Sequence, residues 1–540
     1  MAVRNHRLAA GALAACVALA VLHTWPLAAG PATLSRHDNA DAMLNEWIVA
    51  WVAHQAPRAP LRLFDANIFH PEPRTLAFSE HMTVQGLMGA PVLWLGGSPL
   101  LAYNLLVLAG LALSAWAMWL LVTRWTGSSA AGAVAGTLFA FNAHTLTRLP
   151  HLQALHVEFM PVVLLSLDRL LVERRARDAV ILGAACALQG LASNYLLVFT
   201  AVAAGVGVAV RIDEWRRPHA GRLTAMLGLA AAVTGVMVAP FLYPYYLTQR
   251  EQGLTRSLDE VALYSSSWRD YLSTAGRLHY AAWSHRFLEG STALFPGAVA
   301  LALAIVALAV KPGLRDPRIR MAAAFGAAGF ALSFGPALPG YAALYRWLPL
   351  LQGVRGAARF GFLALVAVAV LAGFGVAALR ARYGTRGWWP AAAVLVFAAV
   401  NAEALRAPIT FRPFGGIPRI YQSLRDPSVR AVAEFPVFRP ESIHRNAAYV
   451  LNSTAHWKPL VNGYSGFVPA SYPAAADALG DFPGNRSRDE LRRLGVSHVV
   501  VHLDAYGARA GELLTALNAT PWLSLVASAD QIRVYRLVTS

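Results

Sequence analysis

Apolar runs of about 18–25 residues, each long enough to cross a membrane as one helix, fill most of the first 405 positions of this chain. Such runs leave few folds open, because a segment in lipid must satisfy its backbone hydrogen bonds internally. Only 14% of the 540 residues are charged, against roughly 25% in soluble domains. We therefore predict a polytopic α-helical membrane protein.

Basic side chains collect in every second short loop between these runs, as in the loops with Arg174, Arg175 and Arg177 or with Arg380, Arg382 and Arg386. This asymmetry is typical of cytoplasmic loops. It accounts for most of the net charge of +17, so the charge indicates topology and not a nucleic-acid partner.

The charge pattern predicts about eleven spans, with the N-terminus inside and the C-terminus outside. The long run Ala179–Val210 is divided at Ser193–Tyr195, because a single helix would reverse every later loop. A cleavable signal peptide is the alternative for residues 1–30, but we expect an uncleaved first helix. The predicted spans lie near 8–29, 98–123, 129–145, 156–172, 178–192, 194–210, 222–247, 293–310, 321–338, 360–379 and 388–405.

Residues 1–405 are predicted to form the membrane domain, with outer loops at 30–97 and 248–292. Residues 406–540 are more polar and predict a periplasmic α/β domain. Its expected elements are strands within Val429–Val437 and Val496–Leu503, a helix at Arg486–Gly495 and a hairpin at Leu523–Leu537 that turns at Ala529–Asp530. The domain contains neither glycine-rich phosphate-binding pattern of nucleotide-binding folds.

Two acids, Asp38 and Asp41, follow the first span directly. In the structural interpretation, Asp38 caps a helix and Asp41 complements its dipole. In the functional one, a carboxylate at the membrane surface takes a proton from an acceptor hydroxyl or binds a divalent metal, Mg or Mn. The apolar residues Leu44, Trp47, Ile48 and Trp51 recur at helical spacing, which predicts a helix lying in the membrane interface.

Further polar residues are expected on the same outer face. Glu80 and His81 end the first outer loop, and a second group lies at the outer mouth of the third and fourth spans: Arg148, His151, His156 and Glu158. Ionisable groups at helix ends in a membrane are costly and usually have a partner or a purpose. Each histidine taken alone is more often a satisfied interfacial residue than a ligand.

Arg355 and Arg359 are spaced by one helical turn before the tenth span, which suits phosphate binding. Anchoring to lipid headgroups is the alternative. In Ala455–Pro469, Trp457 and Tyr464 are candidates for stacking on a sugar ring and Asn462 for binding its hydroxyls, although the loop is equally typical of a packing segment.

The order of these features resembles the GT-C superfamily of polytopic glycosyltransferases. The similarity covers nearly the whole chain and is carried by NEWIVAWVAHQ, FSEH, HLQALHVEFMP, RSLDEVALYS, LFPG, GVRGAARF and HWKPLVNGYSGF, which resemble a mostly uncharacterised bacterial branch.

The resemblance implies inverting transfer of a sugar from a polyprenyl-phosphate carrier to a glycan, lipid or protein acceptor of the envelope. The reaction would take place at the outer face of the bacterial inner membrane. Asp38 or Asp41 would act as base or metal ligand. The alternatives are a transporter or flippase of lipid-linked sugars and a non-catalytic envelope scaffold.

Overall fold

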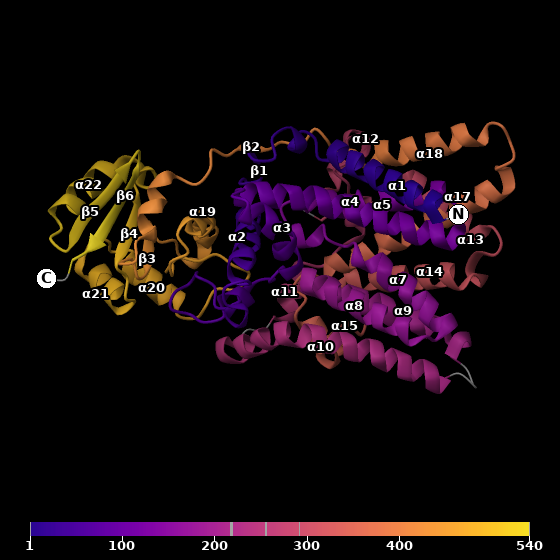
Figure 1. The fold of residues 1–540 in the computed structure, drawn as a ribbon, viewed down its shortest axis with the longest axis horizontal. Helices are drawn as coiled ribbons and strands as arrows, with labels where there is room; N and C mark the ends of the chain where they lie inside the picture. The colour runs from indigo at the N-terminus through magenta and orange to yellow at the C-terminus, as the bar shows by residue number, and fades with distance from the viewer. Residues whose placement is uncertain (1, 216–219, 254–255, 291, 539–540) are drawn as a thin grey trace. The chain divides into compact units, whose positions relative to one another are not determined.

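The computed structural model describes residues 2–215, 220–253, 256–290 and 292–538, and Figure 1 labels its helices and strands. The chain divides into two compact units. Unit 1 contains Met1–Gly30, Asn104–Phe241 and Thr255–Thr410, and unit 2 contains Pro31–Tyr103, Leu242–Leu254 and Phe411–Ser540. The first outer loop thus belongs to the same unit as the C-terminal segment, which differs from the predicted division into 1–405 and 406–540.

A helix overlaps each predicted span. These helices are α1 (Ala2–His23), α4 (Pro99–Thr126), α5 (Ser129–Ala140), α7 (Phe159–Glu173), α8 (Ala176–Ala192), α9 (Asn194–Val210), α10 (Ala220–Gln252), α13 (Ala298–Ala309), α14 (Pro317–Ser333), α17 (Gly361–Tyr383) and α18 (Trp389–Ala404). Shorter helices connect them: α6 (Ala143–Thr147), α11 (Leu258–Leu263), α12 (Arg277–Ala282), α15 (Tyr341–Trp347) and α16 (Pro349–Gln352).

Among the described helices, 4 are long and apolar enough to cross a membrane: His6–His23, Pro99–Thr126, Ala220–Gln252 and Ala357–Tyr383. The others are shorter, and α5 and α13 have only 12 residues each, or about 18 Å against a hydrocarbon core of about 30 Å. The number of spans and their orientation therefore stay predictions. The division of Ala179–Val210 into two helices is confirmed, because Ser193 ends α8 and caps α9.

Helix α17 packs against α5, α13 and α14 in the core of unit 1. Glycines permit this close approach. A Cβ at Gly375 of α17 would lie 2.1 Å from the carbonyl oxygen of Leu303 in α13, and one at Gly326 of α14 would lie 2.3 Å from Cβ of Ala367. Larger side chains would force these helices apart.

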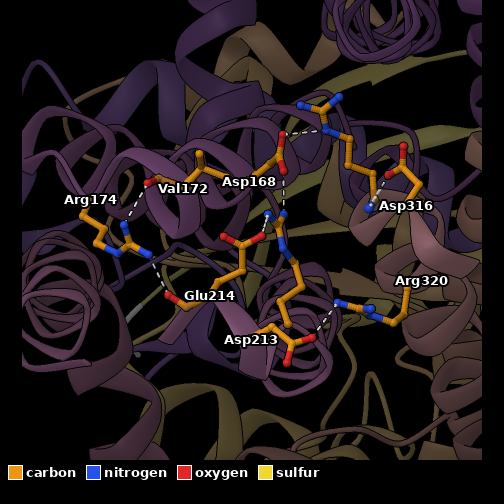
Figure 2. A network of polar contacts seen from close by, with 9 residues as sticks. Asp168, Val172, Arg174, Asp213, Glu214, Asp316 and Arg320 are labelled. Atoms are coloured by element: carbon orange, nitrogen blue, oxygen red, sulfur yellow. Dashed lines mark hydrogen bonds and ion pairs between the residues drawn. The ribbon is translucent and has the colours of Figure 1, made fainter. Parts of the chain in front are cut away.

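A buried ion network joins α7, α9 and α14 (Figure 2). The Asp168 carboxylate accepts hydrogen bonds from Arg211 Nη1 at 2.5 Å and from Arg318 Nε at 3.0 Å. Arg211 also donates to Glu214 at 2.8 Å. Since Arg211 is fully buried and Asp168 is 4% exposed, the network has the paired charges that burial requires.

Unit 2 combines helices from the first outer loop with an α/β module. Its helices are α2 (Ala40–Gln55), α3 (Thr83–Trp94), α19 (Ala447–Asn452), α20 (Tyr472–Leu479), α21 (Asn485–Arg493) and α22 (Ala510–Ala519). Its strands are β1 (Leu34–Ser35), β2 (Arg412–Pro413), β3 (Val432–Phe435), β4 (His498–His502), β5 (Leu523–Ala529) and β6 (Ile532–Leu537).

The main sheet has the order β3-β4-β6-β5, with β3 parallel to β4 and the other pairs antiparallel. One face, with Phe435 and Val501, packs in the same apolar cluster as Leu491 of α21 and Leu517 of α22. The strands, the helix ending before Gly495 and the hairpin are confirmed as predicted. The hairpin turn includes Asp530, whose φ is 46°.

The prediction that α2 lies in the membrane interface is wrong. Leu44, Trp47, Ile48 and Trp51 are each at most 5% exposed within the protein, and α2 packs against α3 and α19. Both indole N–H groups donate to protein acceptors, that of Trp47 to Asn67 Oδ1 and that of Trp51 to the Leu63 carbonyl. The apolar stripe faces a protein core, because protein and lipid select the same side chains.

Candidate functional site

The candidate acids lie where β1 leads into α2. Asn39, and not Asp38, caps this helix, since its side chain accepts from the Asp41 N–H at 2.8 Å. Asp41 therefore lies in the first turn of α2, where the helix dipole favours a negative charge. Asp38 lies outside the helix.

Asp38 forms an ion pair with Arg36. The guanidinium donates to both carboxylate oxygens, at 2.9 and 3.1 Å, and the Asp38 side chain is 37% exposed. The Arg36 hydrogen bond lowers the pKa of Asp38 below its ordinary value. Both oxygens of this carboxylate are therefore already engaged by one guanidinium group.

Asp41 is in contact with the C-terminal segment of unit 2. The hydroxyl of Tyr464 donates to Asp41 Oδ1 at 2.7 Å, across 423 positions of sequence. Both side chains are half-buried. Two residues that the sequence analysis proposed for different tasks therefore share one hydrogen bond.

Glu46 and His37 form a pair that the sequence analysis missed. Glu46 is fully buried in α2, and His37 Nε2 lies 2.8 Å from its Oε1. Burial raises the pKa of Glu46, against the opposing effect of His37. The sequence signal for this pair was the acidic residue Glu46 in a helix that consists mostly of apolar residues.

Glu80 and His81 are both buried, at 9% and 2% exposure. His81 Nδ1 lies 2.7 Å from Thr83 Oγ1, and its ring contacts Phe64 and Tyr245. Burial lowers the pKa of His81 to about 4, so the imidazole is neutral at pH 7.

Two of the proposed sugar-contacting side chains are engaged within unit 2. Trp457 stacks on His54 with ring centroids 4.4 Å apart and also contacts Trp51. Asn462 is fully buried, accepts from the Glu434 N–H at 2.7 Å and donates to the Glu434 carbonyl at 2.9 Å. Asn462 thus holds strand β3 and has no surface for a sugar hydroxyl.

Unit 1 gathers basic residues around α6. His144 is buried at 6% exposure, and Arg148, His151 and Arg359 all lie within electrostatic range of its ring. Arg148 itself is 8% exposed. The structure therefore brings together two basic segments that are far apart in the sequence.

His156 and Glu158 form a buried pair instead, with His156 Nδ1 2.9 Å from Glu158 Oε1. Gln189 of α8 donates to the His156 carbonyl at 2.9 Å, and Ser114 of α4 contacts the Glu158 carboxylate. Because His156 is fully buried, this pair joins helices and does not face a ligand.

The predicted arrangement of Arg355 and Arg359 on one helical face is wrong. Gly356 is extended, with φ −105° and ψ 93°, and only a 3₁₀ turn follows at Ala357–Phe360. Arg355 stacks over Tyr264 and lies 3.0 Å from Glu260, whereas Arg359 lies over Tyr195. Within the described chain, no carboxylate lies at ion-pair distance from Arg359.

The donor set does not fit a protein-held metal ion. The Asp38 carboxylate forms an ion pair with Arg36. The Asp41 carboxylate accepts a hydrogen bond from the Tyr464 hydroxyl. In the part of the chain that the structure describes, no group of three or more His, Cys, Asp or Glu side chains has a metal-binding arrangement.

No family model matches this chain, and no curated protein sequence matches it. Solved structures are similar at low identity. Apo oligosaccharyltransferase from Archaeoglobus fulgidus shares 13% identity over 96% of this chain and 73% of its own, with a TM-score of 0.53. The same organism's AglB, in complex with an inhibitory peptide and a dolichol-phosphate, shares 14% identity over 96% and 72%, with a TM-score of 0.47.

ArnT from Cupriavidus metallidurans, bound to undecaprenyl phosphate, shares 14% identity over 84% of this chain and 87% of its own, with a TM-score of 0.43. The first of these likenesses establishes similarity of fold. The predicted type of fold is therefore confirmed at this level: this chain is similar in fold to an archaeal oligosaccharyltransferase.

Proposed function

We propose that this protein is a membrane glycosyltransferase that moves a sugar from a polyprenyl-phosphate carrier to an envelope acceptor. The fold likeness to an oligosaccharyltransferase supports this class, as does the apolar character of the chain. A carrier with its tail in the bilayer keeps its phosphate at headgroup depth, so we place the reaction at the outer surface of the bacterial inner membrane.

We propose Asp41 as the general base. The observation that carries this choice is the contact of Asp41, at the start of α2, with the Tyr464 hydroxyl, whereas both carboxylate oxygens of Asp38 accept from Arg36. In the reaction, Asp41 takes the proton of an acceptor nucleophile. The nucleophile bonds to the anomeric carbon, the bond from this carbon to the phosphate oxygen breaks, and the lipid phosphate leaves with the electron pair.

Separately, within unit 1, Arg148 and Arg359 are proposed as contacts for a phosphate group. Guanidinium groups bind phosphate through paired N–H donors, and both residues lie close to His144 in unit 1. Arg355 is a further candidate, although it lies 3.0 Å from Glu260 and stacks over Tyr264.

The test compares wild type with Asp41→Asn and, as the matched control, Asp38→Asn. Purified protein in lipid vesicles is supplied with a panel of radiolabelled hexoses and pentoses linked to undecaprenyl phosphate, together with envelope extract as acceptor. We expect Asp41→Asn to lower transfer by about 10²–10⁴-fold, the usual contribution of a general base, with unchanged folding.

Transfer that survives Asp41→Asn in full would remove the mechanism as drawn. Movement of the labelled lipid across the vesicle membrane without any transfer, equal in wild type and variant, would favour a transporter of lipid-linked sugars instead.

A further inference from the structure

We infer that Tyr464 is a positioning residue for Asp41, supplied by the C-terminal segment of unit 2. This inference rests on the proposed function and adds a residue to it. The tyrosine hydroxyl would fix the direction of the carboxylate and favour its ionised form, so the C-terminal segment would be needed for transfer as well as for folding.

The segment before Tyr464 is bound to the first outer loop by backbone hydrogen bonds. The Leu460 N–H donates to the Asn67 carbonyl at 2.7 Å, and the His70 N–H donates to the Leu460 carbonyl at 2.9 Å. The Phe69 N–H donates to the Asn462 carbonyl at 3.2 Å. Ladder-like bonds of this kind fix the register of two extended segments, so the position of Tyr464 along the loop is set.

The other side of the segment is fixed to the sheet. The Asn462 amide pairs with both backbone groups of Glu434 in β3. Gly463 then passes directly against the Phe69 ring, where an added Cβ would lie 2.4 Å from a ring carbon. Only glycine fits this approach, and Tyr464 is the next residue.

Asp41 is fixed from its own side by the start of α2. Its backbone N–H is bound by the Asn39 cap at 2.8 Å, which leaves the side-chain torsions as its main freedom. A donor hydroxyl at 2.7 Å restricts these torsions. A hydrogen bond to the charged form of a carboxyl lowers its pKa, so Tyr464 would keep Asp41 ionised to lower pH.

The alternative is that the contact only joins the two segments. The many hydrogen bonds around Asn462 already do this, and Tyr464 is half-buried. If Tyr464 only joined the two segments, its loss would lower stability but leave the pH dependence of transfer unchanged. The test therefore measures both.

The experiment measures kcat/KM for transfer from pH 4 to 9 in wild type, Tyr464→Phe and the control Tyr472→Phe. Tyr472 is a buried tyrosine of the same unit that donates to the Phe438 carbonyl at 2.8 Å. We expect Tyr464→Phe to raise the pKa of the acid limb by about one pH unit and to lower transfer at pH 7 about tenfold through lost orientation. Tyr472→Phe should not move the acid limb.

A second measurement does not depend on activity. Thermal midpoints are compared for Tyr464→Phe, Asp41→Ala and the double variant, and the double should lose less than the sum of the two single variants, because both changes remove the bond that Tyr464 and Asp41 share. Additive midpoint losses, or an unmoved acid limb in Tyr464→Phe, would overturn the inference. Full transfer by Asp41→Asn would instead overturn the proposed function.

Discussion

Asp168 in unit 1 and Asp41 in unit 2 both lie on helices, and they differ in burial and in the side chains that donate to them. Asp168 is 4% exposed and accepts from two guanidinium groups, those of Arg211 and Arg318 (Figure 2). Asp41 is half-buried and accepts from the neutral hydroxyl of Tyr464. A buried carboxylate that accepts from two guanidinium groups stabilises the fold, whereas a partly exposed carboxylate in contact with a hydroxyl group is the better candidate for chemistry.

The largest expected effect that tests this comparison is on the free energy of unfolding. Asp168→Asn leaves the buried Arg211 and the partly exposed Arg318 without their shared partner, so we expect the free energy of unfolding to fall by about 3–5 kcal/mol. Denaturant titration of the detergent-solubilised protein, followed by tryptophan fluorescence, measures it.

Arg320→Gln is the control for that measurement. Its partner Asp213 lies 3.8 Å away and is 64% exposed, so this variant should change the free energy by less than about 0.5 kcal/mol. If Asp41→Asn destabilised the protein as much as Asp168→Asn, the distinction between a structural and a functional carboxylate would fail.

The second expected effect is a loss of stability in unit 2 as the pH falls. His81 has a pKa of about 4 against an ordinary value of 6.5, so the unfolded chain binds a proton that the folded one excludes. Stability is therefore complete above pH 6.5 and falls as the pH drops toward 4, by about 1.4 kcal/mol per pH unit and about 3 kcal/mol in all.

His81→Gln should flatten this acid dependence in a series of unfolding curves at pH 4 to 7. His456 has a pKa lowered in the same way, to about 4, so a double variant should flatten it further. An unchanged slope in both variants would show that unit 2 does not owe its acid sensitivity to these histidines.

The smallest effect belongs to Asp38→Asn. It removes a partly exposed ion pair with Arg36, which is worth about 0–1 kcal/mol. We expect transfer within about threefold of wild type, since both oxygens of this carboxylate already accept from Arg36. Should Asp38→Asn abolish transfer while Asp41→Asn does not, the roles of the two acids would be exchanged.

Local patterns predicted the secondary structure well. The apolar runs contain the helices, Ser193 divides α8 from α9, and the hairpin β5–β6 lies where alternating residues indicated it. These features depend on neighbours within one turn or one hairpin, so the sequence alone carries enough information to predict them.

The sequence predicts which residues belong to the candidate site but not which of them are in contact. Asp41 and Tyr464 were both singled out, but their contact spans 423 positions and no local pattern encodes such a distance. Glu46 was overlooked because its partner His37 becomes significant only once α2 is buried. Arg355 and Arg359 were expected to share a helical face, and the extended Gly356 separates them.

By itself, the sequence determined that this is a helical membrane protein with an α/β segment at its end, because hydropathy and charge act on each segment separately. Tertiary structure decided what each apolar or charged face meets. The stripe of Trp47 and Trp51 faces protein and not lipid, and Tyr464 reaches Asp41. Lipid and protein interiors exclude water alike, so only the packing of distant segments distinguishes them.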